Sequence, residues 1–141
     1  MLTAASSKKR LLHEIGDLVS GVYGLNTGIV VEALLARENL GPTGVGNGVA
    51  LPHAHIEGLE SVVGAFVLLD RPVDFDSVDR QPVDIAFALF APLNAGVEHL
   101  KALALVSRTL REASIRAKIR SNPDPTTIFA ILSETQNSQA A

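Results

Sequence analysis

Hydrophobic residues in the amino-terminal third of the chain recur at the spacing of an amphipathic helix. The apolar stripe that carries this pattern is Leu11, Ile15, Leu18 and Val22. It predicts a first helix that begins at a cap formed by Ser6 or Ser7, because serine oxygens accept hydrogen bonds from the free N–H groups of a first turn. A second helix is expected from a cap at Asn26 or Thr27 to Gly41-Pro42, a pair that ends helices.

The middle of the chain carries near-continuous apolar runs, not the alternating pattern of a half-exposed strand. Ser61–Leu69 and Val83–Phe90 are such runs, which predicts strands covered on both faces. Val49–Leu51 is expected to form a short strand that ends at Pro52, because proline cannot donate to a ladder. The polar segment between the two long runs leaves room for one more short strand at Val73–Phe75.

The carboxyl-terminal third returns to helical spacing. Its main stripe is His99, Leu103, Val106 and Leu110. We expect a helix over Ala95–Arg111 that is capped by Asn94, and a shorter helix over Ala113–Arg120. A last helix is predicted from a cap at Asp124, with Pro125 at its first position, where proline fits a helix.

The order of these elements places helices before and after a set of strands. Helices on both sides of a central sheet are the natural way to bury such strands. With 141 residues, the chain is expected to form a single domain over 1–141. Only the ends, about 1–5 and 136–141, are expected to be loose. The pattern does not fix the strand order.

Composition narrows the classes of function. The chain has 12 Lys and Arg against 15 Asp and Glu, so it lacks the broad basic surface of a nucleic-acid-binding protein. It has no cysteine, which excludes disulfides, thiol nucleophiles and cysteine-ligated metal sites. Its apolar runs fall far short of the about 20 residues that a membrane span needs. We therefore expect a cytoplasmic protein with no membrane insertion.

A glycine-rich loop after the second predicted helix is the first candidate for chemistry. Its residues are Thr43, Gly44, Val45, Gly46, Asn47 and Gly48. Glycines at alternate positions allow positive φ and let backbone N–H groups approach an anion. The loop is not a Walker A motif, since no Gly-Lys-Ser/Thr follows, and it leads from a helix into a strand, unlike a Rossmann fingerprint. From these residues alone, a phosphate loop and a plain tight loop both remain open.

Two histidines come directly after this segment. In an extended chain, the side chains of His53 and His55 point to the same side. Imidazole titrates near pH 6.5 and much of it is neutral at pH 7, so one of them could accept a phosphoryl group on a ring nitrogen. The pair could also begin a metal site, with His99 as a third ligand. Two histidines without chemistry are the remaining alternative.

Other side chains could act on the same site. His99 lies in the first turns of its predicted helix, where a helix amino end favours an anion and a neutral ring; a histidine of the core is the alternative. Arg37 ends the second helix, where it either complements the helix dipole or donates its planar fork to phosphoryl oxygens. His13 is expected on the solvated surface. The aspartates of the turn-rich region are expected to be turn formers and solvated charges: Asp74, Asp76, Asp79 and Asp84.

One long ordered string, Arg37–His53, resembles the signature of the fructose/mannitol-type enzyme IIA (EIIA) domains of the bacterial phosphotransferase system. It reads Arg-Glu-Asn-Leu-Gly-Pro-Thr-Gly-Val-Gly-Asn-Gly-Val-Ala-Leu-Pro-His. The Gly46-Asn47-Gly48 version is most similar to the nitrogen-regulatory branch, enzyme IIA-Ntr. The resemblance covers about Ser6 to Glu134, and further stretches support it: Ser7–Arg10, Phe75-Asp76, Gln81–Asp84 and Glu98–Leu103.

The resemblance implies an α/β fold with a single mixed β-sheet flanked by helices on both faces. It implies that His53 accepts a phosphoryl group on Nε2 from the phosphohistidine of a small carrier protein, HPr or its paralogue NPr. His99 matches the second active-site histidine of the family, and Arg37 matches its arginine near the loop. The phosphate loop would comprise Thr43, Gly44, Gly46, Asn47 and Gly48. No metal and no cofactor is implied.

The nitrogen-regulatory branch implies a phosphocarrier that regulates other proteins, such as potassium transport and sensor-kinase systems, by its phosphorylation state. An EIIA component of sugar uptake that passes phosphate to a IIB domain is the alternative within the family. Outside the family, the alternatives are a metal-dependent hydrolase that uses His53, His55 and His99, and a binding module whose histidines are structural.

Two features depart from the family pattern. His55 stands where relatives more often carry a basic or small residue, so it could share the phosphoryl site. The chain starts late relative to such domains, which leaves an amino-terminal strand open. A carrier protein would have to approach His53 closely, and the candidates for an apolar docking surface are Val45, Val49 and Leu51.

Overall fold

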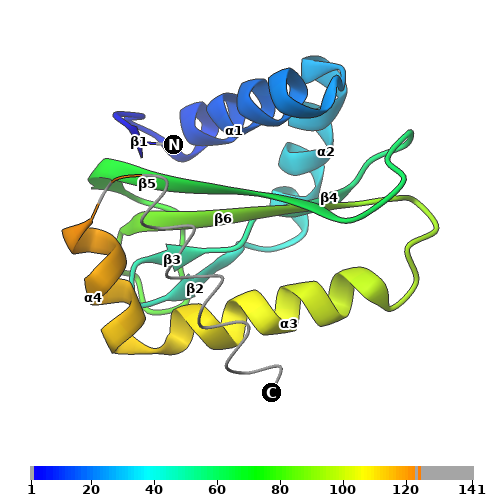
Figure 1. The fold of residues 1–141 in the computed structure, drawn as a ribbon. Coiled ribbons are helices and arrows are strands. Elements are labelled where there is room, and N and C mark those ends of the chain that lie inside the picture. The colour runs from blue at the N-terminus through cyan, green and yellow to red at the C-terminus, as the bar shows by residue number, and fades with distance from the viewer. Residues whose placement is uncertain (1, 123, 125–141) are drawn as a thin grey trace.

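A computed structural model describes residues 2–122 and residue 124 of the chain. Its elements are, in order, β1 (Leu2–Thr3), α1 (Lys8–Tyr23), α2 (Thr27–Leu40), β2 (Gly44–Gly46), β3 (Val49–Ala50), β4 (His53–His55), β5 (Val63–Val73), β6 (Val83–Ala91), α3 (Glu98–Arg111) and α4 (Ala113–Ser121). The strands form one layer, with α1 and α2 on one side and α3 and α4 on the other (Figure 1). The predicted fold class, a mixed sheet with helices on both faces, is therefore confirmed.

The sheet is built around its two long strands. β5 and β6 pair antiparallel, from Val63 opposite Phe90 to Val73 opposite Val83. β1 pairs parallel with β5, while β3 and β4 both pair parallel with β6, one after the other along its length. β2 pairs antiparallel with β3. The order is β1-β5-β6-β3-β2, with β4 also beside β6.

Strand β6 supplies side chains to the core on both faces of the sheet. Ala86, Ala88 and Phe90 pack in the cluster that includes the buried faces of α1 and α2, whereas Ile85 packs in the cluster of α3 and α4. Successive residues of a strand point to opposite faces. Because helices cover both faces, the apolar run predicted over Val83–Phe90 forms a buried strand.

The first two helices begin where the sequence predicts. Ser7 Oγ accepts a hydrogen bond from the N–H of Arg10 at 3.1 Å, and Asn26 Oδ1 accepts one from the N–H of Ile29 at 3.1 Å. Gly24 ends α1 in the left-handed conformation, with φ 69°. These contacts confirm Ser7 and Asn26 as the caps, because each satisfies a free N–H of a first turn.

Three short strands differ from the prediction. Leu2–Thr3, expected to be loose, form β1 against Leu68 and Leu69 of β5. Gly44–Gly46 was expected in a loop, and His53–His55 was not predicted as a strand. The separate strand at Val73–Phe75 is wrong, because Val73 is the last residue of β5. Strands of two or three residues show no period in the sequence, and their pairing depends on partners far along the chain.

Helix α3 begins later than predicted. Gly96 has φ 61°, outside the range of a right-handed helix, so the helix starts only at Glu98. Asn94, the expected cap, lies in a turn before Gly96, and Val97 occupies the cap position without a side-chain hydrogen bond. Apart from its cap Asp124, the last predicted helix lies outside the described residues, and so does the end predicted to be loose, about 136–141. None of the helices in the described part of the chain is long and apolar enough to cross a membrane.

Candidate functional site

His53 lies on strand β4, at a break in the pairing along β6. β3 and β4 follow each other beside β6, and Leu51-Pro52 separates them. Proline has no N–H with which to continue a ladder. At this break the Leu51 carbonyl lies 2.8 Å from Nδ1 of the His53 ring. The Leu51 carbonyl at this interruption of the sheet therefore holds the His53 ring in place.

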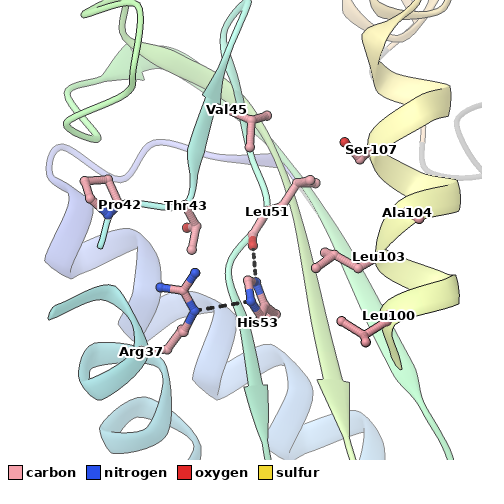
Figure 2. Close-up of a pocket in the computed structure, with 10 residues that line it drawn as sticks. All are labelled: Arg37, Pro42, Thr43, Val45, Leu51, His53, Leu100, Leu103, Ala104 and Ser107. Atoms are coloured by element: carbon pink, nitrogen blue, oxygen red, sulfur yellow. Dashed lines mark hydrogen bonds between the residues drawn. The ribbon is translucent and has the colours of Figure 1, made fainter. Parts of the chain in front are cut away.

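Arg37 and the Leu51 carbonyl together determine which ring nitrogen of His53 carries the proton. The Nε of Arg37 lies 3.2 Å from Nε2 of His53. A guanidinium N–H can only donate, so Nε2 has to accept with its lone pair and the proton of the neutral ring is on Nδ1. Nδ1–H then donates to the Leu51 carbonyl, and Figure 2 shows both hydrogen bonds. The nitrogen that faces Arg37 is the nucleophilic one.

The end of α2 anchors the Arg37 side chain. Arg37 lies in the last turn of this helix, as predicted. Its Nη1 donates a hydrogen bond to the Gly41 carbonyl at 2.9 Å, directly after the helix. The guanidinium therefore lies between the Pro42-Thr43 segment and the His53 ring (Figure 2). A cation held in this place favours an anion beside Nε2.

The pKa of His53 is lowered from its usual value of 6.5. Partial burial is the main cause, because the charged ring loses hydration. The hydrogen bond to Leu51 opposes the shift, the charges of Arg37 and His99 lower the pKa further, and the Glu38 carboxylate raises it. The net effect keeps the ring neutral at pH 7, with its lone pair available.

His53 and Arg37 border a largely apolar cavity of about 360 Å³ between the β2–β4 segment and α3 (Figure 2). The residues that line it are Arg37, Pro42, Thr43, Val45, Leu51, His53, Leu100, Leu103, Ala104 and Ser107. Val45 is 47% exposed and Leu100 is 55% exposed, so apolar side chains at the cavity also reach solvent. Exposed apolar surface around a polar centre suits the approach of another protein.

His99 lies in the first turn of α3, as predicted, but it does not line this cavity. Its Nδ1 is 3.1 Å from the Gly96 carbonyl, and its ring makes an edge contact with His55, with centroids 4.5 Å apart. His53 and His55 alternate with buried Ala54 along β4, so both lie on one side of the strand. His99 acts on His53 through its charge, which lowers the pKa of His53.

The three histidines do not form a metal-binding arrangement. Among the residues that the structure describes, no group of three or more His, Cys, Asp or Glu could hold a metal ion. The metal-dependent alternative with His53, His55 and His99 therefore gains no ligand set from this geometry. That the purified protein holds no metal stays a prediction.

The glycine-rich segment is a β-hairpin. β2 and β3 flank the two-residue turn Asn47-Gly48, where φ is 59° and 77°. Positive φ at both positions is typical of a type I′ turn, for which Asn-Gly is the preferred pair. Asp79 accepts the N–H of Asn47 at 2.9 Å, and Arg120 donates to the Asn47 carbonyl at 3.0 Å. The Asn-Gly pair was the sequence signal for this hairpin.

The predicted phosphate loop overlaps with this hairpin. Of its expected members, Thr43 alone borders the cavity. Gly44, Gly46, Asn47 and Gly48 belong to the hairpin, and the Asn47 N–H already donates to a carboxylate. The hairpin contributes an apolar wall to the cavity through Val45, and the binding of a phosphoryl group by the predicted loop residues stays a prediction.

The structure also shows where the predicted docking residues and the aspartates lie. Val45 lines the cavity and is exposed, as expected of a docking surface. Leu51 also lines the cavity, but at 4% exposure it belongs to the core, as does Val49 at 2%. The aspartates are turn formers and ion-pair partners: Asp74 accepts the N–H of Asp76, Asp79 that of Gln81, and Asp84 pairs with Arg120. The N–H donors of Asn47 and Gln81 lower the pKa of Asp79.

Two charged residues near the site were missed. Glu38 is buried, and Lys8 Nζ lies 2.9 Å from its Oε1. Nothing in helical spacing distinguishes a buried glutamate from an exposed one. The available signal was that Lys8 and Glu38 both belong to stretches that carry the family resemblance, Ser7–Arg10 and Arg37–His53.

The family model for the phosphoenolpyruvate-dependent sugar phosphotransferase system, EIIA 2, matches residues 1–135. The chain belongs to this family. A nitrogen regulatory protein of Bradyrhizobium diazoefficiens is 47% identical to this EIIA chain over 127 residues, which cover 90% of the chain and 83% of that protein. One from Pseudomonas aeruginosa is 41% identical over 134 residues, which cover 94% and 87%.

Solved structures agree with the fold and the branch. The nitrogen regulatory protein IIA-Ntr from Neisseria meningitidis matches with a TM-score of 0.88 and 39% identity, over 94% of this EIIA chain and 90% of that chain. IIA mannitol from Escherichia coli matches with a TM-score of 0.76 over 94% and 93%, and at 22% identity it supports the fold alone. The similarity to nitrogen regulatory proteins confirms the branch that Gly46-Asn47-Gly48 indicated.

Proposed function

We propose that this EIIA chain is a regulatory phosphocarrier whose His53 accepts a phosphoryl group on Nε2 from the phosphohistidine of an HPr- or NPr-type carrier. The observation that carries the proposal is the pair of hydrogen bonds on the His53 ring. The Leu51 carbonyl accepts from Nδ1–H at 2.8 Å, and Arg37 donates to Nε2 at 3.2 Å. Together they direct the lone pair of a neutral ring toward a guanidinium at an apolar cavity.

The transfer is a displacement between two imidazoles. The Nε2 lone pair of His53 forms a bond to phosphorus as the nitrogen–phosphorus bond of the donor breaks, and the electron pair of that bond stays on the donor ring. The His53 ring gains positive charge while Nδ1 keeps its proton. The Leu51 carbonyl stabilises this charge, in keeping with its effect of raising the pKa of His53. Positioning and charge stabilisation are what phosphoryl transfer asks of a protein.

Arg37 changes its partner during this step. Its Nε–H occupies the Nε2 lone pair in the free protein and has to leave it before a bond to phosphorus forms. Its fork can then donate to the phosphoryl oxygens. Because Nη1 stays bonded to the Gly41 carbonyl at 2.9 Å, a small rotation of the guanidinium is enough. Thr43, on the other side of the guanidinium, is the loop residue that we propose beside the phosphoryl group.

The docking partner meets the apolar side chains around the cavity. Val45 and Leu100 are exposed there, and a carrier whose phosphohistidine is surrounded by apolar residues would cover them. We propose that this encounter takes place in the cytoplasm, where EIIA and carrier meet. Regulation follows from charge: a phosphoryl group adds about two negative charges, so a target that docks over Val45 and Leu100 distinguishes the two forms. Potassium transport and sensor-kinase systems are the targets that we propose.

The test is incubation with a phosphorylated HPr or NPr, followed by intact mass measurement at mildly alkaline pH, where phosphohistidine survives. We expect the wild-type chain to gain one phosphoryl group and His53→Ala to gain none. His13→Ala, an exposed histidine on α1, is the matched control and should behave like the wild type. A folded His53→Ala protein that still gains the phosphoryl mass would remove His53 as the acceptor.

A further inference from the structure

Three of the stretches that carry the family resemblance meet at one buried carboxylate. Lys8, from Ser7–Arg10, places its Nζ 2.9 Å from Oε1 of Glu38, at the carboxyl end of α2. The same ammonium lies 3.4 Å from the Phe75 carbonyl and 4.8 Å from the centre of the Phe75 ring. Helix α1, helix α2 and the loop after β5 therefore share a contact beside the site, and the transfer chemistry described above makes no use of it.

Both carboxylate oxygens of Glu38 are engaged by one residue. The backbone N–H of Thr43 donates to Oε1 at 2.8 Å, and its hydroxyl donates to Oε2 at 2.7 Å. The Glu38 side chain is only 5% exposed. A buried carboxylate is costly unless it is paired and hydrogen-bonded; Lys8 supplies the charge and Thr43 the hydrogen bonds. Thr43 is therefore fixed in place at the wall of the cavity.

From Thr43 the hydrogen bonds continue to the His53 ring. The Thr43 carbonyl accepts the N–H of Leu51 at 2.9 Å. The carbonyl of Leu51 in turn accepts from Nδ1 of His53 at 2.8 Å. The Leu51 peptide groups lie outside the strands, next to Pro52, so their orientation depends on these contacts. The path from Lys8 to His53 is continuous, and each step is a hydrogen bond or an ion pair.

We propose that Glu38, held by Lys8, is a positioning residue for the transfer: through Thr43 it orients the Leu51 carbonyl that fixes the Nδ1–H tautomer of His53. The proposal rests on the proposed function of His53. Arg37 and Glu38 are neighbours on α2, so one helix end holds the His53 ring from both sides, directly through Arg37 and indirectly through Glu38. The Glu38 carboxylate also raises the pKa of His53, against the effect of Arg37.

The test reads the tautomer of His53 without any donor. Nitrogen-15 NMR of histidine-labelled protein distinguishes a protonated Nδ1 from a protonated Nε2. We expect Nδ1–H in the wild type and a mixture of both tautomers in Glu38→Gln. One amide oxygen cannot replace two carboxylate oxygens, so the Leu51 carbonyl loses its orientation and the Arg37 contact alone has to hold the tautomer. The rate of phosphoryl acceptance should fall about 10- to 100-fold, the usual cost of removing a group that orients a reacting residue.

Variants of Thr43 and of Lys8 separate a positioning role from an effect on folding. Thr43→Val removes the hydroxyl and should shift the tautomer, whereas Thr43→Ser keeps the hydroxyl and should restore the wild-type signal. Lys8→Met, at the far end of the path, should shift the tautomer in the same direction. Asp76→Asn is the control: Asp76 is the exposed partner of Lys8 at 3.4 Å, and asparagine tolerates its positive φ.

The outcomes are distinct from those that test the function. A pure Nδ1–H tautomer and a wild-type rate in folded Glu38→Gln or Lys8→Met protein would overturn the positioning role, even if His53 is the acceptor. A shifted tautomer in these variants, with no phosphoryl transfer to the wild type from any carrier, would overturn the proposed function and leave the positioning role of Glu38 on the ring intact.

Discussion

The Nε2 lone pair of His53 is at once the proposed nucleophile and the acceptor of an N–H from Arg37. A hydrogen bond to the neutral form keeps the ring unprotonated, and this effect adds to burial, which lowers the pKa of His53. The same bond shields the lone pair until an anion competes for the guanidinium. In the proposed transfer, Arg37 therefore first stabilises the resting His53 ring and later the phosphoryl group.

Replacing Arg37 should separate these two effects. In Arg37→Met we expect the pKa of His53 to rise, because a nearby positive charge that lowers it is removed. Phosphoryl acceptance should slow about 10²- to 10³-fold without being abolished, as when one positioned donor is lost. An NMR titration of His53 beside stopped-flow transfer kinetics measures both quantities. An unchanged titration midpoint together with a wild-type rate would remove Arg37 from the site.

Replacing His55 tests whether the contacts with Arg37 and Leu51 make His53 the phosphoryl acceptor. It is exposed, shares a side of β4 with His53, and its ring contacts that of His99. We expect His55→Ala to be phosphorylated fully, because His55 lacks the bonds to Arg37 and Leu51 that prepare His53. Intact mass after long incubation measures this. A folded His55→Ala protein that gains no phosphoryl group would show that the wrong histidine has been chosen.

At the scale of the elements, the β2–β3 hairpin is held by contacts from segments far along the chain. Its turn is held from two sides, by Asp79 on the Asn47 N–H and by Arg120 on the Asn47 carbonyl. Arg120 also makes a two-pronged contact with Asp84, at 2.8 and 2.9 Å. Helix α4 and the loop after β5 therefore fix the hairpin that carries Val45 to the cavity. A rigid wall of this kind keeps the mouth of the cavity in one shape.

Gly48 is where this arrangement is most sensitive to substitution. Its φ is 77°, and a Cβ there would meet the Arg120 guanidinium and the Asp84 carboxylate. Gly48→Ala should cost at least about 1–2 kcal/mol of unfolding free energy, the cost of a left-handed residue with a Cβ. Urea denaturation measures it. Gly21→Ala is the matched control: it lies in α1 with nothing within 4 Å of its Cβ, and should stabilise by about 0.5–1 kcal/mol.

The elements also show what the sequence could and could not predict. The caps at Ser7 and Asn26 and the apolar runs of β5 and β6 depend on neighbours along the chain, and all were predicted. Of the run in β5, only Val67–Leu69 are buried, whereas Val63–Phe66 are half-buried. β1 and β4 consist of two and three residues whose partners lie on β5 and β6, so no local period reveals them. At the site, His53, Arg37 and Thr43 came from the family string. The Lys8–Glu38 pair joins residues far apart along the chain, and only the folded structure brings them together.

On the scale of the whole molecule, the site takes its residues from both helical layers and from the sheet between them. Arg37 comes from the α1–α2 layer and Leu100 and Leu103 from α3, with His53 on the strand between them (Figure 2). Each layer has its own core cluster. The geometry around His53 therefore requires both helical layers to be in place, so the site is complete only in the fully folded protein.

The lowered pKa of His53 links the stability of the fold to pH. Below the usual value of 6.5, the unfolded chain takes up the proton first, so stability should fall as the pH drops from 6.5 through the folded pKa of His53. Urea denaturation of wild type and His53→Gln at about pH 7.5 and about pH 5.5 measures this dependence. The variant should lose less stability between the two conditions. The lowered pKa of Asp79 affects stability in a separate pH range, below its usual pKa of 3.8.

The shortness of β4 limits how another protein can bind at this edge of the sheet. Within residues 2–122, β4 pairs with β6 alone, and an edge strand invites a foreign strand to add to it by backbone hydrogen bonds. The Pro52 carbonyl accepts the N–H of Leu89 of β6, and a strand of only three residues leaves a very short row of backbone groups on its other side. A visiting chain is thus denied a continuous backbone template and has to recognise side chains. Such recognition suits a partner that must arrive, exchange a group and leave quickly, because no sheet has to be broken on departure.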